Sequence, residues 1–219
     1  MGCVLADKDF YQPSEISCLL ESHTEEVLNI DEITSDDGFF LPHHGVLRSG
    51  DRARPLRVAF NGSQKTDLNI SLNDVLSKGG VIQEDLFSIT LRSGKHAYFF
   101  SSDIRHIFRQ IEINPEERHF QNNLWKQGRN EPVQIYKLKT VTYGTTPTCY
   151  LSTRVLKQLA IDEEDNFRIA ANIVRQDVYL DDILTGCSNL KELEILKTEL
   201  VQLFESAGMS LHKWCFLTF

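Results

Sequence analysis

The sequence is poor in the features that mark fibrous, membrane or secreted proteins. Its 219 residues include only 12 glycines and six prolines, too few for a collagen-like or low-complexity chain. No apolar run approaches the roughly 18 residues that a membrane helix needs, and the N-terminus lacks the basic-then-apolar layout of a signal peptide. With 41% hydrophobic and 25% charged residues, the composition is that of a globular protein. We therefore expect no membrane contact, no secretion and an intracellular location, either cytoplasmic or nuclear.

Cysteines at metal-binding spacing are also missing. The five cysteines are odd in number and widely scattered, and no Cys-x-x-Cys occurs. They fit free thiols in a reducing compartment better than a disulfide framework or a zinc site. The adjacent His43 and His44 are a weak metal candidate, because neighbouring residues of a strand point to opposite faces.

An overall excess of basic charge is missing as well, since the formal net charge is −8. The acids are concentrated, because residues 1–40 hold ten acids and one base and leave 21 acids and 22 bases for the rest. Residues 45–57 are locally basic and suit phosphate groups, although a solvated hairpin fits the same charges. A turn-forming cluster at residues 35–38 predicts a domain boundary there. We therefore predict an acidic segment, residues 1–38, followed by one domain, residues 39–219.

Hydrophobic periodicity and turn signals predict an alternation of strands and helices. The predicted strands are 45–47, 56–60, 97–102, 121–126, 133–139, a hairpin around 181–182, and 209–214. The predicted helices are 85–91, one from Asn114, 146–159, and a long helix capped by Ser188 and stopped by Gly208. Without the 121–139 hairpin, the order from Asp103 onward is that of the split β-α-β layout of ferredoxin-like α+β domains. That layout places the strand of Asp103 beside the 181–182 hairpin.

Two adjacent carboxylates, Asp181 and Asp182, interrupt an apolar run at the tip of the predicted hairpin. Such a pair is costly to hold in place unless a cation neutralises it. Together with Asp103, it would complete an oxygen cluster for two Mg²⁺ ions about 4 Å apart, as in phosphoryl-transfer enzymes. An ordinary hairpin turn, in which Asp is a favoured residue, accounts for the same pair.

The order of these motifs resembles the palm and fingers of a reverse transcriptase, and more narrowly the Pao/BEL group of long-terminal-repeat retrotransposons. The strings that carry the likeness include Leu41-Pro42-His43-His44, residues 56–60, residues 71–76, Asp103-Ile104, Tyr143-Gly144, Tyr179-Leu180-Asp181-Asp182 and residues 211–214. The likeness covers roughly residues 39–214 and implies an α+β, ferredoxin-like palm with partial fingers and no thumb. Residues 4–20 resemble the tail of the aspartic-protease region that precedes the polymerase, so the chain looks like a piece of a polyprotein.

The resemblance implies a metal-dependent reaction at the three acids. Asp103, Asp181 and Asp182 would hold two Mg²⁺ ions, which Mn²⁺ could replace. Asp103 and Asp181 would be the main ligands, and Asp182 would tune the pair. Lys213 would protonate the leaving pyrophosphate, although a solvated lysine fits this position equally well.

The resemblance also implies contacts with the nucleotide. Arg57, assisted by Arg48, would grip the triphosphate, because a planar guanidinium matches phosphate oxygens. Phe108 would exclude a 2′-hydroxyl and so select deoxynucleotides, whereas an ordinary core position is the alternative for this aromatic residue. Tyr143 and Gly144 would contact nucleotide and template.

The function implied is an RNA-directed DNA polymerase that acts on deoxynucleoside triphosphates and an RNA or DNA template with its primer. A catalytically inactive retrotransposon remnant, acting as an interaction module if at all, is the competing reading. A different two-metal palm enzyme, such as a nucleotide cyclase, shares the fold but would not explain Arg57, Tyr143-Gly144 and Tyr179-Leu180-Asp181-Asp182 together. The sequence leaves the oligomeric state open.

Overall fold

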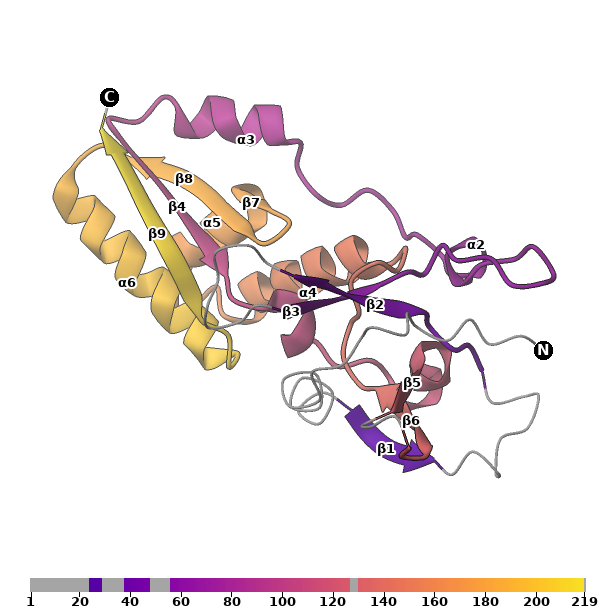
Figure 1. Cartoon of the computed structure of the whole chain (residues 1–219). Helices are drawn as coiled ribbons and strands as arrows, with labels where there is room; N and C mark the ends of the chain where they lie inside the picture. The colour runs from indigo at the N-terminus through magenta and orange to yellow at the C-terminus, as the bar shows by residue number, and fades with distance from the viewer. Residues whose placement is uncertain (1–23, 29–37, 48–55, 127–129, 219) are drawn as a thin grey trace. The chain divides into compact units, whose positions relative to one another are not determined.

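The computed structural model describes residues 24–28, 38–47, 56–126 and 130–218 (Figure 1). Its contacts divide the chain into unit 1, residues 1–78 and 111–148, and unit 2, residues 79–110 and 149–219. The chain contains both helices and strands, which confirms the predicted α+β class as a mixture of the two. The predicted boundary at residue 38 lies at the edge of a described range and stays a prediction.

Unit 1 contains two small antiparallel sheets. One has the order β1 (Thr24–Leu28), β6 (Val133–Leu138) and β5 (Asn122–Lys126), and the other pairs β2 (His43–Leu47) with β3 (Leu56–Phe60). Its helical parts are α2 (Leu72–Val75) and the 3-10 helix η3 (Pro115–Gln121). A buried cluster forms its core: Leu41, Val58, Leu72, Trp125, Tyr136 and Leu138.

Local signals in unit 1 predict most of these elements. The predicted 121–139 hairpin is confirmed as β5 and β6. The helix predicted from Asn114 begins there, and the Asn114 side chain accepts a hydrogen bond from the Glu116 amide at 3.3 Å. The helix is of the 3-10 type, as is common for a short connector. Strand β1 was not predicted, because residues 1–40 are only weakly periodic.

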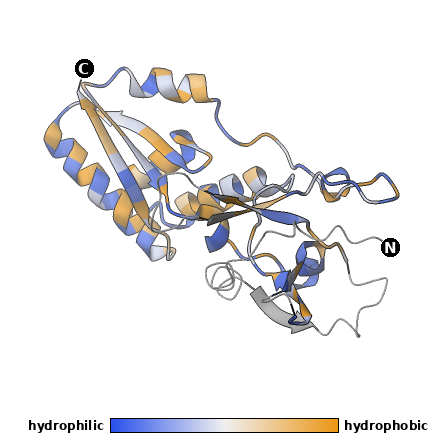
Figure 2. Ribbon diagram, viewed as in Figure 1, coloured by the Kyte–Doolittle hydropathy of each residue, from blue (hydrophilic) through white to orange (hydrophobic). Residues whose placement is uncertain are grey.

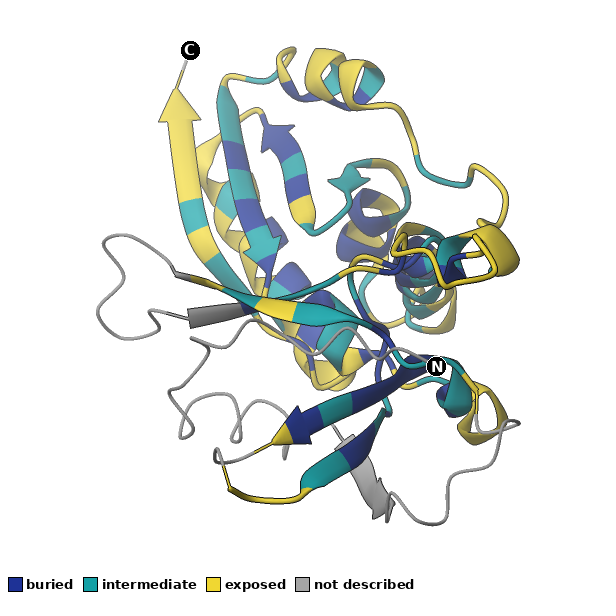
Figure 3. Ribbon diagram, turned by 45° about the vertical axis from the view of Figure 1, so that its right-hand side comes forward, coloured by how far each residue is buried: buried dark blue, intermediate teal, exposed yellow. Residues whose placement is uncertain are grey.

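Unit 2 is built on one antiparallel sheet with the order β7 (Val178–Tyr179), β8 (Asp182–Cys187), β4 (Tyr98–Ile104) and β9 (Leu211–Thr218). The predicted pairing of the Asp103 strand with the 181–182 hairpin is confirmed, because β4 pairs with β8. Figure 3 shows β8 largely buried, whereas β9 at the edge of the sheet is mostly exposed. The outer part of β9 leaves Phe216 and Leu217 about half exposed.

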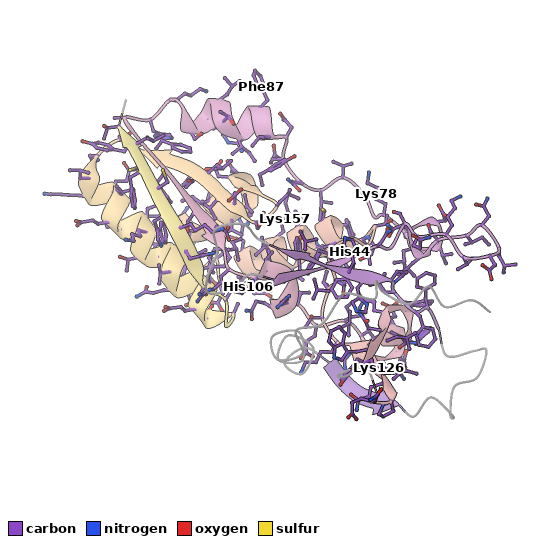
Figure 4. The ribbon with its side chains drawn as sticks, viewed as in Figure 1. His44, Lys78, Phe87, His106, Lys126 and Lys157 are labelled. Carbon is purple, nitrogen blue, oxygen red and sulfur yellow. The ribbon has the colours of Figure 1, made fainter. Side chains whose placement is uncertain are left out.

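The helices of unit 2 are α3 (Leu86–Ser93), η2 (Ile107–Gln110), α4 (Thr148–Asp162), α5 (Arg168–Gln176) and α6 (Leu190–Ser206). Helix α3 begins where predicted, because Asp85 accepts a hydrogen bond from the Ser88 amide at 2.9 Å. Ile89 of this helix is buried, whereas the Phe87 side chain projects outward (Figure 4). In the described part of the chain, no helix has the length and hydrophobicity to cross a membrane.

Helix α6 is amphipathic, and Figure 2 shows hydrophobic and hydrophilic residues alternating along it. The side chains buried there are Leu196, Leu200, Leu203 and Phe204. Gly208 ends the helix at φ +70°, and the amides of Gly208 and Met209 bond to the carbonyls of Glu205 and Phe204, as in a Schellman motif.

The predicted cap of α6, Ser188, was wrong by one residue. Asn189 is the cap, because its side chain accepts a hydrogen bond from the Glu192 amide at 3.0 Å. The Ser188 amide instead donates to the Glu192 carboxylate at 2.9 Å. The two bonds together satisfy amides on both sides of the helix start.

Helix α5 was not predicted, and its N-terminus shows why. Phe167 precedes the helix and supplies no side-chain cap. The Glu199 carboxylate of α6 accepts hydrogen bonds from the amides of Ile169 and Ala170 at 3.0 and 3.2 Å instead. A cap supplied by another helix leaves no local signal in the sequence.

Candidate functional site

The three candidate acids of unit 2 lie at one end of its sheet. Asp103 near the end of β4 is the cross-strand partner of Asp182 at the start of β8. Side chains of directly opposite residues share a face of the sheet, with their Cβ atoms roughly 5 Å apart. Asp181 precedes β8, and its carbonyl accepts a hydrogen bond from the Ile104 amide at 2.7 Å. Backbone register therefore brings all three residues together.

The turn that carries Asp181 is tight and has an unusual backbone. Tyr179 pairs with Asp182, so Leu180 and Asp181 alone form the loop. Leu180 has φ +58°, a conformation that few residues other than glycine adopt. Such backbone conformations are often found at functional sites, where surrounding contacts hold them in place.

Asp103 is held by two residues of β9. The Lys213 ammonium donates to Asp103 Oδ2 at 2.6 Å. His212 Nδ1 lies 3.0 Å from the Asp103 carbonyl oxygen and 3.3 Å from Oδ1. Lys213 has φ +54° at the point where the β4–β9 register shifts, and such an irregularity redirects a side chain. The Asp103 side chain is 17% exposed, whereas that of Lys213 is 69% exposed.

Like charges crowd this end of the sheet. Partial desolvation raises the pKa of Asp182, although the residue is exposed, and the negative charges of Asp181 and Asp103 raise it further, while Lys213 opposes them. The hydrogen bond to Asp103 raises the pKa of Lys213, and the charges of all three acids act in the same direction. Three carboxylates and one ammonium therefore form a single electrostatic cluster.

One side chain, that of Lys213, neutralises part of the negative charge of this cluster. Within the described ranges, no three His, Cys, Asp or Glu side chains gather so that they could hold a metal ion. One oxygen of Asp103 faces Lys213 and the other faces His212. Carboxylate oxygens are nevertheless the donors that Mg²⁺ prefers, so the chemistry of the donor set suits this ion. The metal site remains a prediction.

Tyr143 and Gly144 form a separate site in unit 1. Gly144 has φ +89°, and a Cβ added there would lie 2.4 Å from the Phe60 carbonyl oxygen. No larger residue fits this position without a shift of the backbone. The Tyr143 hydroxyl donates to the Val58 carbonyl, and its ring meets that of Phe60 edge to face with centroids 5.4 Å apart. The turn is therefore fixed against β3.

Asn73 organises this turn and was not identified from the sequence. Its Nδ2 donates to the Gly144 carbonyl at 3.1 Å and to Ser63 Oγ at 2.8 Å. Its Oδ1 accepts from the Thr146 amide at 2.7 Å. The capping box between Ser71 and Asp74 around it was a visible signal, whereas its distant partners were not.

The other predicted residues are placed only in part. Arg57 pairs with Val46 across β2 and β3, and its side chain lies outside the description. Arg48 lies outside the described residues. Phe108 lies in η2 and is partly exposed. His43 is half-buried with its ring 6.0 Å from that of Trp125, and burial lowers its pKa.

Comparison with known proteins gives a likeness of fold. No protein-family model matches the chain, and no curated protein matches it. Among solved structures, it is similar to the "Crystal structure of Prototype Foamy Virus Protease-Reverse Transcriptase (native)", with a TM-score of 0.57 and 18% identity. The match covers 78% of this chain and 20% of the other. This chain thus corresponds to about a fifth of that protein.

Proposed function

We propose that this chain is the fingers and palm of an RNA-directed DNA polymerase from a Pao/BEL-type retroelement. The observation that carries the proposal is the register that sets Asp103 opposite Asp182, with Asp181 in the adjoining turn. The fold likeness to a structure titled as a protease-reverse transcriptase supports it. So does the strand order of unit 2, in which β4 lies between β8 and β9 as in a ferredoxin-like sheet.

The proposed chemistry takes place at the acidic end of the sheet. Asp103 and Asp181 are the proposed ligands of two Mg²⁺ ions, and Asp182 tunes their charge. Bound ions would activate the primer 3′-hydroxyl and neutralise the triphosphate. The like-charge crowding among the acids is the kind of repulsion that a cation relieves.

The remaining roles belong to other residues of this chain. Lys213, already bonded to Asp103, would give a proton to the leaving pyrophosphate. Phe108 would exclude a 2′-hydroxyl on the sugar of the incoming nucleotide. The roles of the unit 1 residues at the nucleotide come from the resemblance: Arg48, Arg57, Tyr143 and Gly144.

An inactive retroelement remnant is the second candidate. Two observations favour it: Lys213 already neutralises Asp103, and the described side chains do not gather as a metal site. A remnant would keep the fold and its internal ion pair without turning over nucleotides.

Primer extension separates the two candidates. The full chain is incubated with a primed RNA template, deoxynucleoside triphosphates and Mg²⁺, and incorporation is compared with that of Asp181→Asn. A polymerase loses about a hundredfold or more of its rate in this variant, because one charge at the reacting phosphates is removed. Asp165→Asn, an exposed change in the same unit, is the matched control and keeps the wild-type rate. Equal incorporation by wild type and Asp181→Asn would reject polymerase chemistry.

A further inference from the structure

Asp177 lies at the base of the hairpin that carries Asp181 and Asp182, where α5 ends and β7 begins. Its Oδ1 accepts a hydrogen bond from Arg92 Nε of α3 at 3.1 Å. Its Oδ2 accepts from the Thr185 hydroxyl of β8 at 2.8 Å. The side chain is only 15% exposed. One carboxylate therefore joins three elements of unit 2.

Backbone bonds strengthen the same junction. The Asp177 carbonyl accepts from the Leu184 amide at 2.8 Å, and Arg92 also donates to the Gln176 carbonyl. The free arm of the hairpin, β7, is only two residues long and pairs with β8 at two positions. Two residue pairs are too few to hold the strained Leu180 turn by themselves. The Ile104 amide also binds the Asp181 carbonyl at the tip, so the position of the turn depends on this bond and on the base of the hairpin.

We propose that Asp177 is a positioning residue that sets the geometry of the Asp181-Asp182 turn through Arg92 and Thr185. The inference rests on the proposed function, because the geometry it sets is that of the proposed metal ligands. Outer residues that orient ligands commonly change metal affinity about tenfold or more when they are altered. Asp177 touches neither nucleotide nor ion and acts only through the hairpin.

A neighbouring ion pair provides the control. Arg175 Nη1 donates to Glu164 Oε1 at 2.9 Å and links α5 to the turn after α4. It lies two residues before Asp177, and its guanidinium bonds to Glu164 and to the Ala160 carbonyl of α4. Glu164→Gln therefore disturbs a salt bridge in the same unit without touching the base of the hairpin.

Ion binding is measured with Tb³⁺, whose luminescence is sensitised by nearby tyrosines such as Tyr179. Wild type is expected to bind Tb³⁺, and Asp181→Asn to lose the signal. Asp177→Asn and Thr185→Val are expected to weaken binding about tenfold at a temperature where circular dichroism shows an intact fold. Thr185→Ser keeps the hydroxyl and is expected to restore wild-type affinity, and Glu164→Gln is expected to leave it unchanged.

Amide hydrogen exchange gives a readout that needs no ion. Asp177→Asn is expected to speed exchange at residues 178–184 while exchange in α6 stays slow. Unchanged exchange there, or equal weakening of Tb³⁺ binding by Glu164→Gln, would overturn the proposal. If wild type shows no Asp181-dependent Tb³⁺ signal, the proposed function fails, and the exchange data alone then decide whether Asp177 positions the hairpin.

Discussion

The two units hold their candidate functional residues in different ways. In unit 2, the register of β4 and β8 places Asp103 and Asp182, and buried side chains such as Phe100 and Leu200 support the sheet. In unit 1, the Tyr143-Gly144 turn is fixed by hydrogen bonds from side chains, above all Asn73, and by a glycine in a left-handed conformation. The placement of Asp103 and Asp182 thus depends on strand pairing over a core, and that of the Tyr143-Gly144 turn on a few polar contacts.

This difference predicts how each unit responds to substitution. A loss of core volume beneath the β4–β8 sheet should destabilise unit 2, whereas a Cβ added at Gly144 or the loss of the Asn73 amide should destabilise unit 1. The two tryptophans allow each unit to be followed separately, because Trp125 lies in unit 1 and Trp214 in unit 2. Trp214→Phe leaves a reporter of unit 1, and Trp125→Phe leaves a reporter of unit 2.

The largest effect is expected from Leu200→Ala on the core side of α6. Leu200 is fully buried, so the change should lower the free energy of unfolding of unit 2 by about 3 kcal/mol. Urea unfolding in the Trp125→Phe background measures it. Ile195→Ala, on the exposed side of the same helix, is the control and should shift the midpoint little. Equal shifts for both variants would contradict the core-based account.

Gly144→Ala tests the turn of unit 1. The new Cβ would meet the Phe60 carbonyl and the backbone would stay at φ +89°, so we expect a loss of about 2 kcal/mol in unit 1. Urea unfolding in the Trp214→Phe background measures this loss. Gly80→Ala in unit 2 is the control for an added methyl group that meets nothing within 4 Å, and it should leave the midpoint unchanged in both tryptophan backgrounds. Wild-type stability in Gly144→Ala would show that the turn is not held against β3.

Asn73→Ala tests whether one polar side chain holds the Tyr143-Gly144 turn of unit 1. Removing its amide leaves the Thr146 amide and the Gly144 carbonyl without this partner, at an expected cost of about 1–2 kcal/mol in unit 1. Asn73→Asp keeps the acceptor for Thr146 and should cost less. The readout is again the urea midpoint of the Trp214→Phe background, and a similar loss in unit 2 would argue against a local effect.

The smallest effect is expected from acid, which should act on both units alike. Hydrogen bonds from Ser71 lower the pKa of Asp74 in unit 1, and those from Ser88 lower the pKa of Asp85 in unit 2. A lowered pKa in the folded state stabilises the fold above the unfolded-state pKa of roughly 4, and this stability is lost as the pH falls through the folded-state value. Urea midpoints at decreasing pH measure the loss. Asp74→Asn should remove its share from unit 1 alone, and an unchanged pH profile in that variant would refute the assignment.

The sequence predicts the fold best where the signals are local. The β5–β6 hairpin, the Asn114 cap, the helix start at Asp85 and the Gly208 stop depend on residues adjacent in the chain, and all are confirmed. Helix α5 was missed because its cap, Glu199, comes from α6. The Ser188 cap was wrong because adjacent Ser and Asn residues give the same local signal.

The same distinction between local and distant signals applies to the residues of the candidate site. The Asp181-Asp182 pair stands out in the sequence because two acids interrupt an apolar run, and the split β-α-β order predicts its neighbour Asp103. Asn73 and Asp177 could not be identified, because their partners Gly144 and Arg92 lie far away in the chain. Thr185 was missed because its role depends on Asp177. The Lys213–Asp103 contact likewise depends on an irregularity of β9 that has no visible sequence signal.

The exposed strand β9 has a practical consequence. It is an edge strand of the unit 2 sheet, and its side chains Phe216 and Leu217 are about half exposed. The outward amides and carbonyls of such a strand can recruit strands of other molecules, and an apolar surface strengthens the attachment. At high concentration the chain is therefore expected to associate by pairing of β9 with an edge strand of another molecule. Leu217→Lys is expected to reduce this association.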